Sequence, residues 1–281
     1  MISDCGFRIA DFKRAAVLLL LATASSLQST ACFLLLLATA SSLQPPACFA
    51  QIHPHSFSPR QLGIMQAWYR ADIIGGTAGD PVASWPDSSA HSRTLTQATA
   101  DYRPTFQSNT QNGRPAIRFD GINDMLAANF AGSLQFTAFS VQRPDIFTLY
   151  ETVYLAQGIN YNVWAAYPTA APQTYLTFGF YGLEGWSYYL PWHASSTTVP
   201  ELWTLRYDQS WWRSWVNGGA LDAQAETKTP YTGTTLNVGA WYQGLRHLDG
   251  DIFELAFFAE ALSDRDRQRM ERYLMRKWGL Q

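Results

Sequence analysis

The hydrophobic pattern of this chain has the two-residue period of half-buried β-strands. Apolar and polar residues alternate in short runs that end at turn residues, at a spacing typical of a two-sheet sandwich. We predict strands over 116–119, 136–141, 202–207, 211–216 and 252–258. The fourth run leads into an Asn-Gly pair, the strongest short signal for a hairpin with a type I′ turn. The last run is nearly continuous in apolar residues, which indicates a buried strand.

Helical signals lie at the two ends of this strand-rich region. Ser58-Pro59 looks like an N-cap followed by proline in the first helical position, so a short helix is predicted there. A long amphipathic helix is predicted from Ser263, because apolar residues recur with helical spacing along one face up to Trp278. The first turn is acidic and the last turn is basic, which matches the helix dipole. Gly279 is placed to end the helix.

The N-terminus has the pattern of an export signal. Lys13 and Arg14 precede the apolar run 15–24, which is too short to span a bilayer and suits a secretory signal. The segment 18–33 is then repeated at 34–49 with 14 of 16 positions identical. We predict a signal peptide with this internal duplication over residues 1–50, cleaved after Ala50, and one domain over 51–281. Cleavage after Ala24 or Ala40, lipidation at Cys48 and an uncleaved anchor are the alternatives.

Composition narrows the function classes. The net charge of -2 lacks the basic excess of a nucleic-acid binder, so no nucleic-acid partner is expected. Cys5, Cys32 and Cys48 all precede Ala50, so the exported domain would contain no cysteine and no thiol chemistry. A signal peptide implies a secreted, extracellular or cell-surface protein, and no membrane span is expected in the mature chain.

Several ordered motifs resemble the laminin-G-like, concanavalin A-like lectin/glucanase superfamily of secreted bacterial proteins. They are the segments 68–72 (WYRAD), 85–89 (WPDSS), 112–124 (NGRPAIRFDGIND) and 250–255 (GDIFEL), the last followed by Ala261-Leu262-Ser263. The resemblance covers about the whole of residues 51–281. It implies an all-β, two-sheet antiparallel jelly-roll sandwich with the C-terminal amphipathic helix. It also implies binding of an extracellular glycan or of a cell-surface protein.

Aromatic residues are the main candidates for a ligand site. The apolar C–H faces of sugars stack on Trp and Tyr rings, and loop residues are more accessible to a ligand than residues in strands. Trp211 and Trp212 are adjacent on a strand, so one should point outward if the other points into the core. The alternative for all these rings is a place in the core. The predicted ligand-binding residues are Trp186, Tyr188, Tyr189, Trp192, Trp212, Trp241 and Tyr242.

A calcium site is the second candidate. Hard cations take carboxylate and amide oxygens, which Asp120, Asn123 and Asp124 could supply from one turn. Phe253 occupies a place where many relatives carry Asp, which removes one potential ligand. The alternative is an Asx turn, in which the same side chains bond their own backbone. No other cofactor is expected.

A glycosidase is the least favoured interpretation. Asp249, Asp251 and Glu254 resemble the E-x-D-x-x-E pattern of retaining glucanases in the same superfamily, where two carboxylates flank the glycosidic bond. The shorter Asp249 stands where the nucleophilic Glu would be, so we expect no catalysis. The sequence therefore favours a non-catalytic carbohydrate-binding module, with an adhesive or structural protein-binding module as the alternative.

Overall fold

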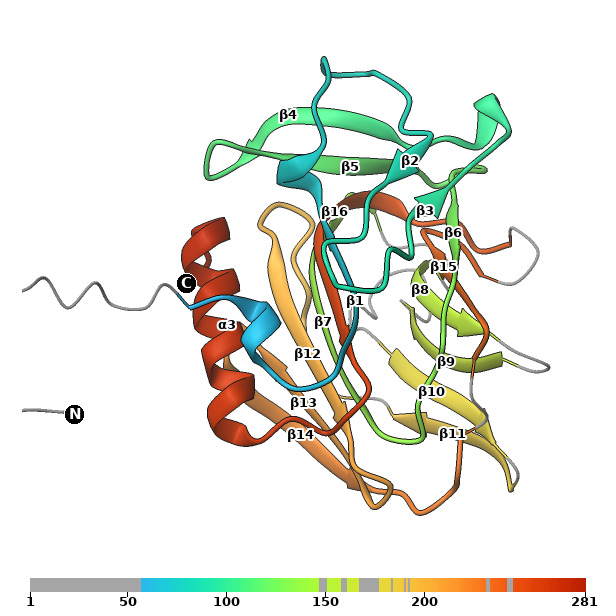
Figure 1. Cartoon of the computed structure of the whole chain (residues 1–281), viewed down its shortest axis with the longest axis vertical. Helices are drawn as coiled ribbons and strands as arrows, with labels where there is room; N and C mark the ends of the chain where they lie inside the picture. The colour runs from blue at the N-terminus through green and yellow to red at the C-terminus, as the bar shows by residue number, and fades with distance from the viewer. Residues whose placement is uncertain are drawn as a thin grey trace, which may run out of the picture. The chain divides into compact units, whose positions relative to one another are not determined.

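In its described residues, the computed structural model shows a two-layered β-structure flanked by the helix α3 (Asp264–Trp278) (Figure 1). Residues 57–281 form one compact unit. The structure describes residues 57–146, 151–157, 161–166, 177–182, 184–189, 191, 193–230, 233–241 and 245–281. The predicted signal peptide and its duplication lie outside the described residues and stay predictions.

Within the part of the chain that the structure describes, two antiparallel sheets of eight strands each face one another. The first sheet has the order β14 (Gly219–Ala225), β13 (Trp211–Val216), β12 (Glu201–Tyr207), β7 (Phe136–Pro144), β16 (Asp249–Phe258), β5 (Arg114–Asp120) and β4 (Thr105–Gln111), and β1 (Met65–Arg70) also pairs with β16. The second has the order β11 (Gly185–Tyr189), β10 (Thr177–Gly182), β9 (Tyr161–Ala166), β8 (Thr152–Gln157), β15 (Thr235–Val238), β6 (Leu126–Asn129), β3 (Leu95–Thr96) and β2 (Ser84–Trp85). The predicted all-β antiparallel jelly-roll sandwich is confirmed.

The predicted strands all occur in the first sheet. Each lies within β5, β7, β12, β13 or β16. The hairpin between β13 and β14 turns at Asn217 and Gly218, whose φ angles of 48° and 76° are those of a type I′ turn. All residues of β16 after Asp249 are buried, as its continuous apolar pattern predicted.

Large aromatic side chains fill the space between the two sheets. Alternate residues of β12 enter this core, as the period of a strand requires. Ring pairs join the sheets directly, for example Phe180 of the second sheet and Tyr207 of the first, whose centroids are 5.2 Å apart. The largest fully buried side chains are Trp85, Trp203, Trp212, Trp278, Tyr69, Tyr189, Tyr207, Phe119, Phe139, Phe178 and Phe180.

Helix α3 (Asp264–Trp278) lies against the outer face of the first sheet (Figure 1). The hydroxyl of Ser263 accepts a bond from the N–H of Asp266, and Gly279 ends the helix with a φ of 65°. The N–H of Leu280 bonds the carbonyl of Met275 at 3.0 Å, which completes a Schellman motif. These features confirm the predicted helix. No helix in the described part of the chain has both the length and the apolar character needed to cross a membrane.

Short 3-10 turns complete the path of the chain. They are η1 (Pro59–Gln61), η2 (Ala71–Ile73) and η3 (Ala100–Tyr102). The first confirms the short helical turn predicted after Ser58. The second follows β1 and places Asp72 and the end of β1 opposite the last turns of α3, where polar side chains of the two segments meet.

Candidate functional site

Two of the predicted ligand-binding residues belong to the core. Tyr189 of β11 and Trp212 of β13 have no exposed surface. Their rings stack on each other across the two sheets, with centroids 5.9 Å apart and planes 4° apart. Since each ring is covered by the other and by its neighbours, neither presents a face to a ligand in this structure. Their burial shows that the prediction of Tyr189 and Trp212 as ligand contacts was wrong for this structure.

Trp211 and Trp212 are adjacent on β13 and point to opposite faces of the sheet, as strand alternation requires. The outward ring is Trp211, whereas Trp212 was the one predicted to contact a ligand. Trp211 is 41% exposed and Trp212 is fully buried. Trp211 lies at the outer face of the first sheet, where the guanidinium of Arg213 stands 5.5 Å from its ring centroid. The outward-facing ring is therefore Trp211.

Among the predicted ligand-binding residues whose side chains are described, Tyr188 is the one with an exposed ring. Its exposed fraction is 54%, and it lies on β11 at the edge of the second sheet. The backbone carbonyl of Tyr188 accepts a bond from the amide of Gln224 at 3.0 Å, which ties β11 to β14. Because Tyr189 points inward, Tyr188 points away from the core on the side opposite to Trp211.

The remaining predicted ligand-binding residues are Trp241, which is buried, and three residues whose side chains or positions are not among the described ones. Trp241 is buried, and Arg246 stands 5.1 Å from its ring centroid. Trp186 lies on β11, where it pairs with Tyr181 along the backbone, and nothing is described of its side chain. Trp192 and Tyr242 lie outside the described residues.

The acidic residues of β16 are bound to partners inside the protein. Asp251 is fully buried and accepts two bonds of 2.8 Å from Arg118 on β5. Arg143 on β7 adds a third bond of 2.5 Å. Asp251 is thus clamped between the two strands that flank β16, because its register partners on either side are these same arginines.

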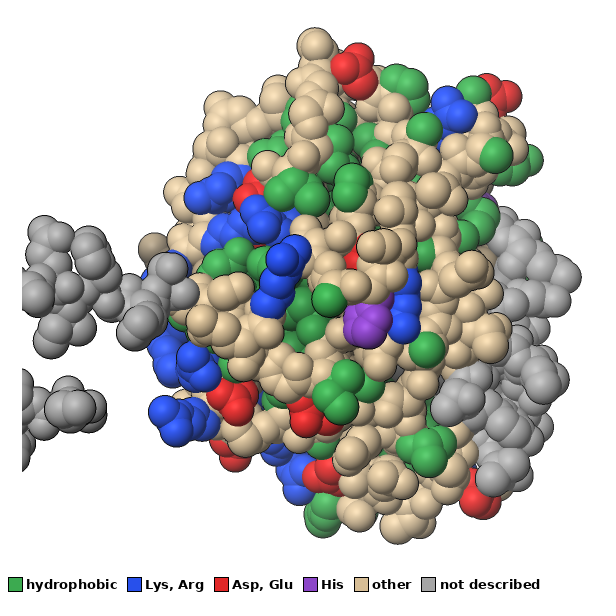
Figure 2. Space-filling view, viewed as in Figure 1, with side chains coloured by type: hydrophobic (Ala, Val, Ile, Leu, Met, Phe, Trp, Pro, Cys, Tyr) green, Lys and Arg blue, Asp and Glu red, His purple; other side chains and the backbone are tan. Residues whose placement is uncertain are grey.

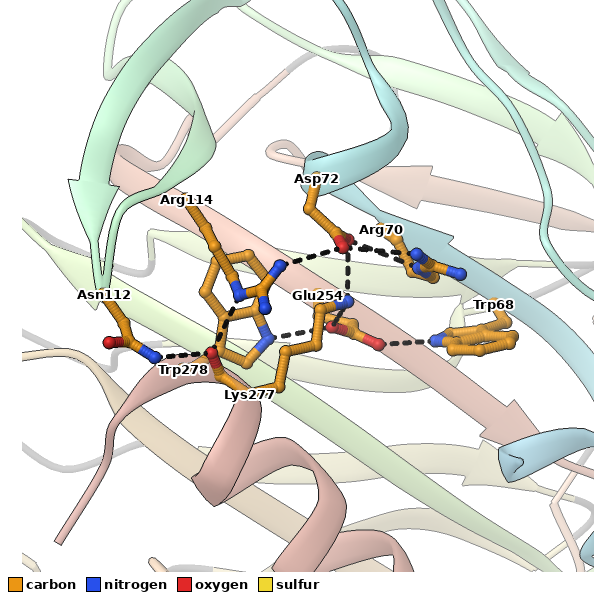
Figure 3. A network of polar contacts seen from close by, with 8 residues as sticks. All are labelled: Trp68, Arg70, Asp72, Asn112, Arg114, Glu254, Lys277 and Trp278. Carbon is orange, nitrogen blue, oxygen red and sulfur yellow. Dashed lines mark hydrogen bonds and ion pairs between the residues drawn. The ribbon is translucent and has the colours of Figure 1, made fainter. Parts of the chain in front are cut away.

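Glu254 is held in the same way at the contact between β16 and α3 (Figure 3). A register shift between Ile252 and Glu254 marks a β-bulge in β16, next to Phe253. The indole N–H groups of Trp68 and Trp278 donate to the two carboxylate oxygens at 2.6 and 2.8 Å, and Lys277 Nζ donates at 2.6 Å. Burial raises the pKa of Glu254, while the charge of Lys277 acts in the opposite direction.

These contacts place the acidic motif in a structural role. A glycosidase needs two carboxyl groups that face the same bond of a bound sugar. Asp251 and Glu254 are both buried, and each already binds cationic groups of the chain. Asp249 is partly exposed, and burial together with the charge of Asp145 raises its pKa. A single accessible carboxyl group on this strand does not form a catalytic pair.

The hydrogen bonds around Asp120 are those of an Asx turn. Its Oδ1 accepts bonds from the backbone N–H groups of Ile122, Asn123 and Asp124 at 2.9, 3.1 and 3.3 Å. Burial acts to raise the pKa of Asp120, but these three bonds outweigh it and hold the pKa below its usual range. Among the described residues no group of three His, Cys, Asp or Glu could hold a metal ion. The turn thus has a structural explanation of its own.

Asp124 and Asn123 are the residues of this turn that would bear on calcium. Burial, and then the charge of Asp120, raise the pKa of Asp124 to about 6. Asn123 Oδ1 is buried and has no hydrogen-bond partner within the described residues. An unpaired amide oxygen in the same turn as two carboxylates is suitable donor chemistry for a hard cation. Calcium binding therefore stays a proposal that a pH and metal titration can test.

We predict that Asp124→Asn raises the melting temperature at about pH 8 and leaves it unchanged at about pH 4. The folded pKa of Asp124 lies above the unfolded value, so protonation of this group stabilises the fold at acidic pH. That stability is lost as the pH rises through about 6. Asn is neutral throughout and can still accept the bond from the Asp120 N–H. The raised pKa corresponds to at most about 3 kcal/mol, and because water screens part of this interaction we expect a gain of about 1 kcal/mol.

Thermal unfolding of both proteins across this pH range, with calcium and with EDTA, measures the effect. Equal pH profiles for the two proteins would contradict the prediction. If calcium at about pH 8 stabilises the natural chain and not Asp124→Asn, the calcium proposal is supported. If calcium changes neither protein, that proposal fails.

Sequence reasoning missed the partners of Glu254. Trp68 was noted as part of a family-like segment and Trp278 as part of an apolar stripe, but both indoles also donate to one buried carboxylate. The last turn of α3 is further held by Asn112 and Arg114, whose side chains donate to the carbonyl of Lys277 at 2.9 and 3.0 Å. A carboxylate within a strongly apolar strand is the sequence signal for such a network, since a buried charge needs partners.

The fold and these contacts define a class: a two-sheet antiparallel β-sandwich in which buried acidic residues of a central strand stabilise the fold. No family model matches the sequence, and no curated protein matches it. The structure does have neighbours among solved proteins. All of those described next share 15% of residues or fewer with this chain, so the similarity concerns the fold.

The ligand-binding domain of botulinum neurotoxin serotype D, solved in complex with N-acetylneuraminic acid, superposes with a TM-score of 0.57 and 10% identity. The match covers 78% of this chain and 53% of the toxin domain, so the chain spans about half the length of that domain. The binding domain of Paraclostridial Mosquitocidal Protein 1 has a TM-score of 0.54 and 11% identity, with 79% and 56% of the two chains covered.

Domain 4 of an extracellular GH43 arabinanase from Geobacillus stearothermophilus, solved in complex with arabinotriose, is similar over its whole length. The TM-score is 0.52 and the identity 15%, and the match covers 75% of this chain and 99% of that domain. The structural neighbours are thus binding domains with a β-sandwich fold, and two of these three were solved with a carbohydrate.

Proposed function

We propose that this chain is a secreted, non-catalytic carbohydrate-binding module of the laminin-G-like, concanavalin A-like type. One observation carries the proposal: a lectin-like sandwich whose most enzyme-like carboxylates, Asp251 and Glu254, are buried and bound to cations of the chain. The export signal predicted over residues 1–50 supports a site of action outside the cell.

Similarity to carbohydrate-binding domains supports the choice of ligand class. The match covers nearly the full length of the arabinanase domain, so the sandwich of this chain is at least as large as that domain. The toxin domain was solved with an acidic sugar and the arabinanase domain with a neutral one. Ligand choice depends on the residues of the site, so the contacts proposed next are side chains of this chain.

The surface proposed to contact a neutral sugar ring contains Tyr188. Its ring is exposed at the edge of the second sheet, and Trp186 precedes it by two positions on β11. Tyr and Trp rings give a sugar a rigid apolar face at low entropic cost. Trp192, which follows β11 closely in the sequence, and Tyr242 remain proposed contributors.

A glycan-array assay on the purified protein tests this proposal. We expect saturable binding to at least one glycan with no release of reducing ends on prolonged incubation, both with calcium and with EDTA. Tyr188→Ala should weaken binding to neutral glycans by about tenfold, since stacking of one ring contributes about 1–1.5 kcal/mol. Tyr102→Ala, which removes an exposed ring of η3, is the matched control and should leave binding unchanged.

Two other outcomes of the glycan assay would contradict the proposal. Release of reducing ends would identify a glycoside hydrolase and overturn the non-catalytic assignment. Absence of binding to every glycan on the array would overturn the carbohydrate proposal. The adhesive, protein-binding module would then become the leading interpretation.

A further inference from the structure

A cleft of about 640 Å³ opens between α3 and the segment that joins β1 to η2. Helix α3 forms one wall, and residues of β1, η2 and β5 form the other. Figure 2 shows Lys and Arg side chains gathered on the side of the molecule that carries α3. The lining residues are Phe57, Arg70, Asp72, Arg114, Arg269, Arg272, Tyr273, Arg276 and Lys277.

The walls of this arginine cleft carry six cationic side chains and one carboxylate. Asp72 is shared by three of the cations: Lys277 at 2.6 Å, Arg70 at 3.2 Å and Arg114 at 3.6 Å. Arg269 is paired with Asp266 at 3.2 Å, and Asp72 cannot balance the other five cations, even with the buried Glu254 behind Lys277. The cleft is therefore strongly positive in a chain whose net charge is -2.

Arg272 and Arg276 are the cations available to a ligand. Both are exposed on α3, and neither has an ion-pair or hydrogen-bond partner among the described residues. They stand one turn apart on the helix, at positions i and i+4, so their guanidinium groups face the same side. Arg114 reaches the cleft from β5 and is 42% exposed. Three arginine side chains thus converge on one opening.

Stabilisation of the helix accounts for only part of this charge. Cations near a helix C-terminus interact favourably with its dipole, and Arg276 lies in that last turn. Arg70 and Arg114 come from other elements, and like charges brought together repel one another. A concave surface of one sign raises the local concentration of oppositely charged ligands. An anionic ligand would relieve the repulsion that the fold alone leaves unbalanced.

Two aromatic rings in the same cleft indicate what carries the anion. The rings of Phe57 and Tyr273 meet edge to face with centroids 5.9 Å apart, and both line the opening. The faces of such rings suit the apolar side of a sugar, whereas a free inorganic anion needs only the cations. Fork-shaped guanidinium groups beside aromatic rings suit a sugar that bears a carboxylate or sulfate.

We propose that the arginine cleft binds an acidic sugar of a polysaccharide, with Arg114, Arg272 and Arg276 holding its carboxylate or sulfate and Phe57 and Tyr273 contacting its ring. This second site rests on the proposed carbohydrate-binding function and specifies a ligand class for it. The cleft is formed by α3, β1, η2 and β5, whereas Tyr188 lies on β11, so variants can separate the two sites.

Binding of heparin, polygalacturonate, chemically desulfated heparin, arabinan and single-stranded DNA to the protein tests the proposal. We expect Arg272→Gln/Arg276→Gln to weaken binding of at least one acidic polysaccharide by about tenfold or more, because charge-assisted hydrogen bonds are the strong ones. Heparin carries both sulfates and carboxylates, so loss of binding on its desulfation identifies a sulfate, whereas binding of polygalacturonate identifies a carboxylate. Inorganic sulfate at millimolar concentration distinguishes a site for the free anion from one for the sugar.

Arg265→Gln is the matched control. It removes one charge from an exposed position of α3 outside the cleft, so it is compared with Arg272→Gln and Arg276→Gln made singly, and its effect should stay below about twofold, as expected for distant screened charges. The proposal is overturned if Arg265→Gln loses as much as a single cleft variant, if sulfate alone competes fully, or if DNA binds as tightly as the polysaccharides. Binding of neutral arabinan alone would overturn the acidic site and leave the proposed function standing. Failure of every glycan would overturn both.

Discussion

Lys277→Met is expected to lower the free energy of unfolding by about 3–5 kcal/mol at about pH 8, the cost of leaving a buried charge without its partner. Lys277 Nζ donates to Glu254 and to Asp72, both at 2.6 Å. Asp72 keeps Arg70 and Arg114, but Glu254 has no exposed side-chain surface and would lose the one cation that it contacts among the described residues. The two indole donors alone leave its charge uncompensated.

The pH dependence of the loss identifies Glu254 as its origin. Burial already raises the pKa of Glu254, and removal of the ammonium group raises it further. A raised folded pKa means that the protonated acid stabilises the fold at low pH and that this stability disappears as the pH rises through the folded value. The difference between Lys277→Met and the natural chain should therefore shrink from about pH 8 towards about pH 5.

Urea unfolding at several pH values gives the measurement, and Arg265→Met is the control. It replaces an exposed cation of the same helix by the same residue, and Arg and Met have similar helix propensities. We expect the control to change stability by no more than about 0.5 kcal/mol, as at most surface positions. A loss for Lys277→Met that is equally small, or that does not depend on pH, would show that Glu254 does not need the ammonium group.

Local sequence patterns predicted the elements of the fold because their causes are local. Strand alternation, the Asn217-Gly218 turn and the Ser263 and Gly279 caps all depend on neighbours within a few positions. The partners of Glu254 depend on tertiary structure instead. Trp68 lies 186 positions away in the sequence, and only the pairing of β1 with β16 brings its indole to the carboxylate.

The same distinction explains the candidate sites. The turn at Asp120 is local, and the Asx alternative foresaw its hydrogen bonds. The arginine cleft combines Arg114 of a strand with Arg272 of the C-terminal helix, which no local pattern connects. Helix periodicity could place Arg272 and Arg276 on one side of α3, but not what that side would face.

Trp211 and Trp212 show what alternation alone leaves undetermined. The period of a strand requires that the two rings point to opposite faces, but only the register against the neighbouring strands sets which face is inside. Trp212 pairs with Tyr207 on β12, whose ring centroid lies 4.8 Å away in the core. Because Trp212 is buried and Trp211 is exposed, replacing each by Ala should change the free energy of unfolding by very different amounts.

Trp212→Ala is expected to lower the free energy of unfolding by about 3–5 kcal/mol and Trp211→Ala by no more than about 1 kcal/mol. The Trp212 ring packs against Tyr189, Phe180 and Tyr207, and its N–H bonds the hydroxyl of Ser187 at 3.1 Å, so truncation leaves a cavity and an unpaired acceptor. Trp211 would lose its contact with Arg213 and some partly exposed surface. Equal losses in urea unfolding would show that the assignment of inner and outer ring is wrong.

Glycan binding by two other variants, Trp212→Phe and Tyr188→Ala, separates a core ring from a ligand contact. Trp212→Phe keeps an aromatic ring in the core, and we expect it to bind glycans as the natural chain does at temperatures where it stays folded. Tyr188→Ala should show the reverse, with weaker binding and a stability change of no more than about 0.5 kcal/mol, as for most surface substitutions. If folded Trp212→Phe loses binding while Tyr188→Ala keeps it, the ligand is recognised through the inner ring, and the sandwich must open to admit it.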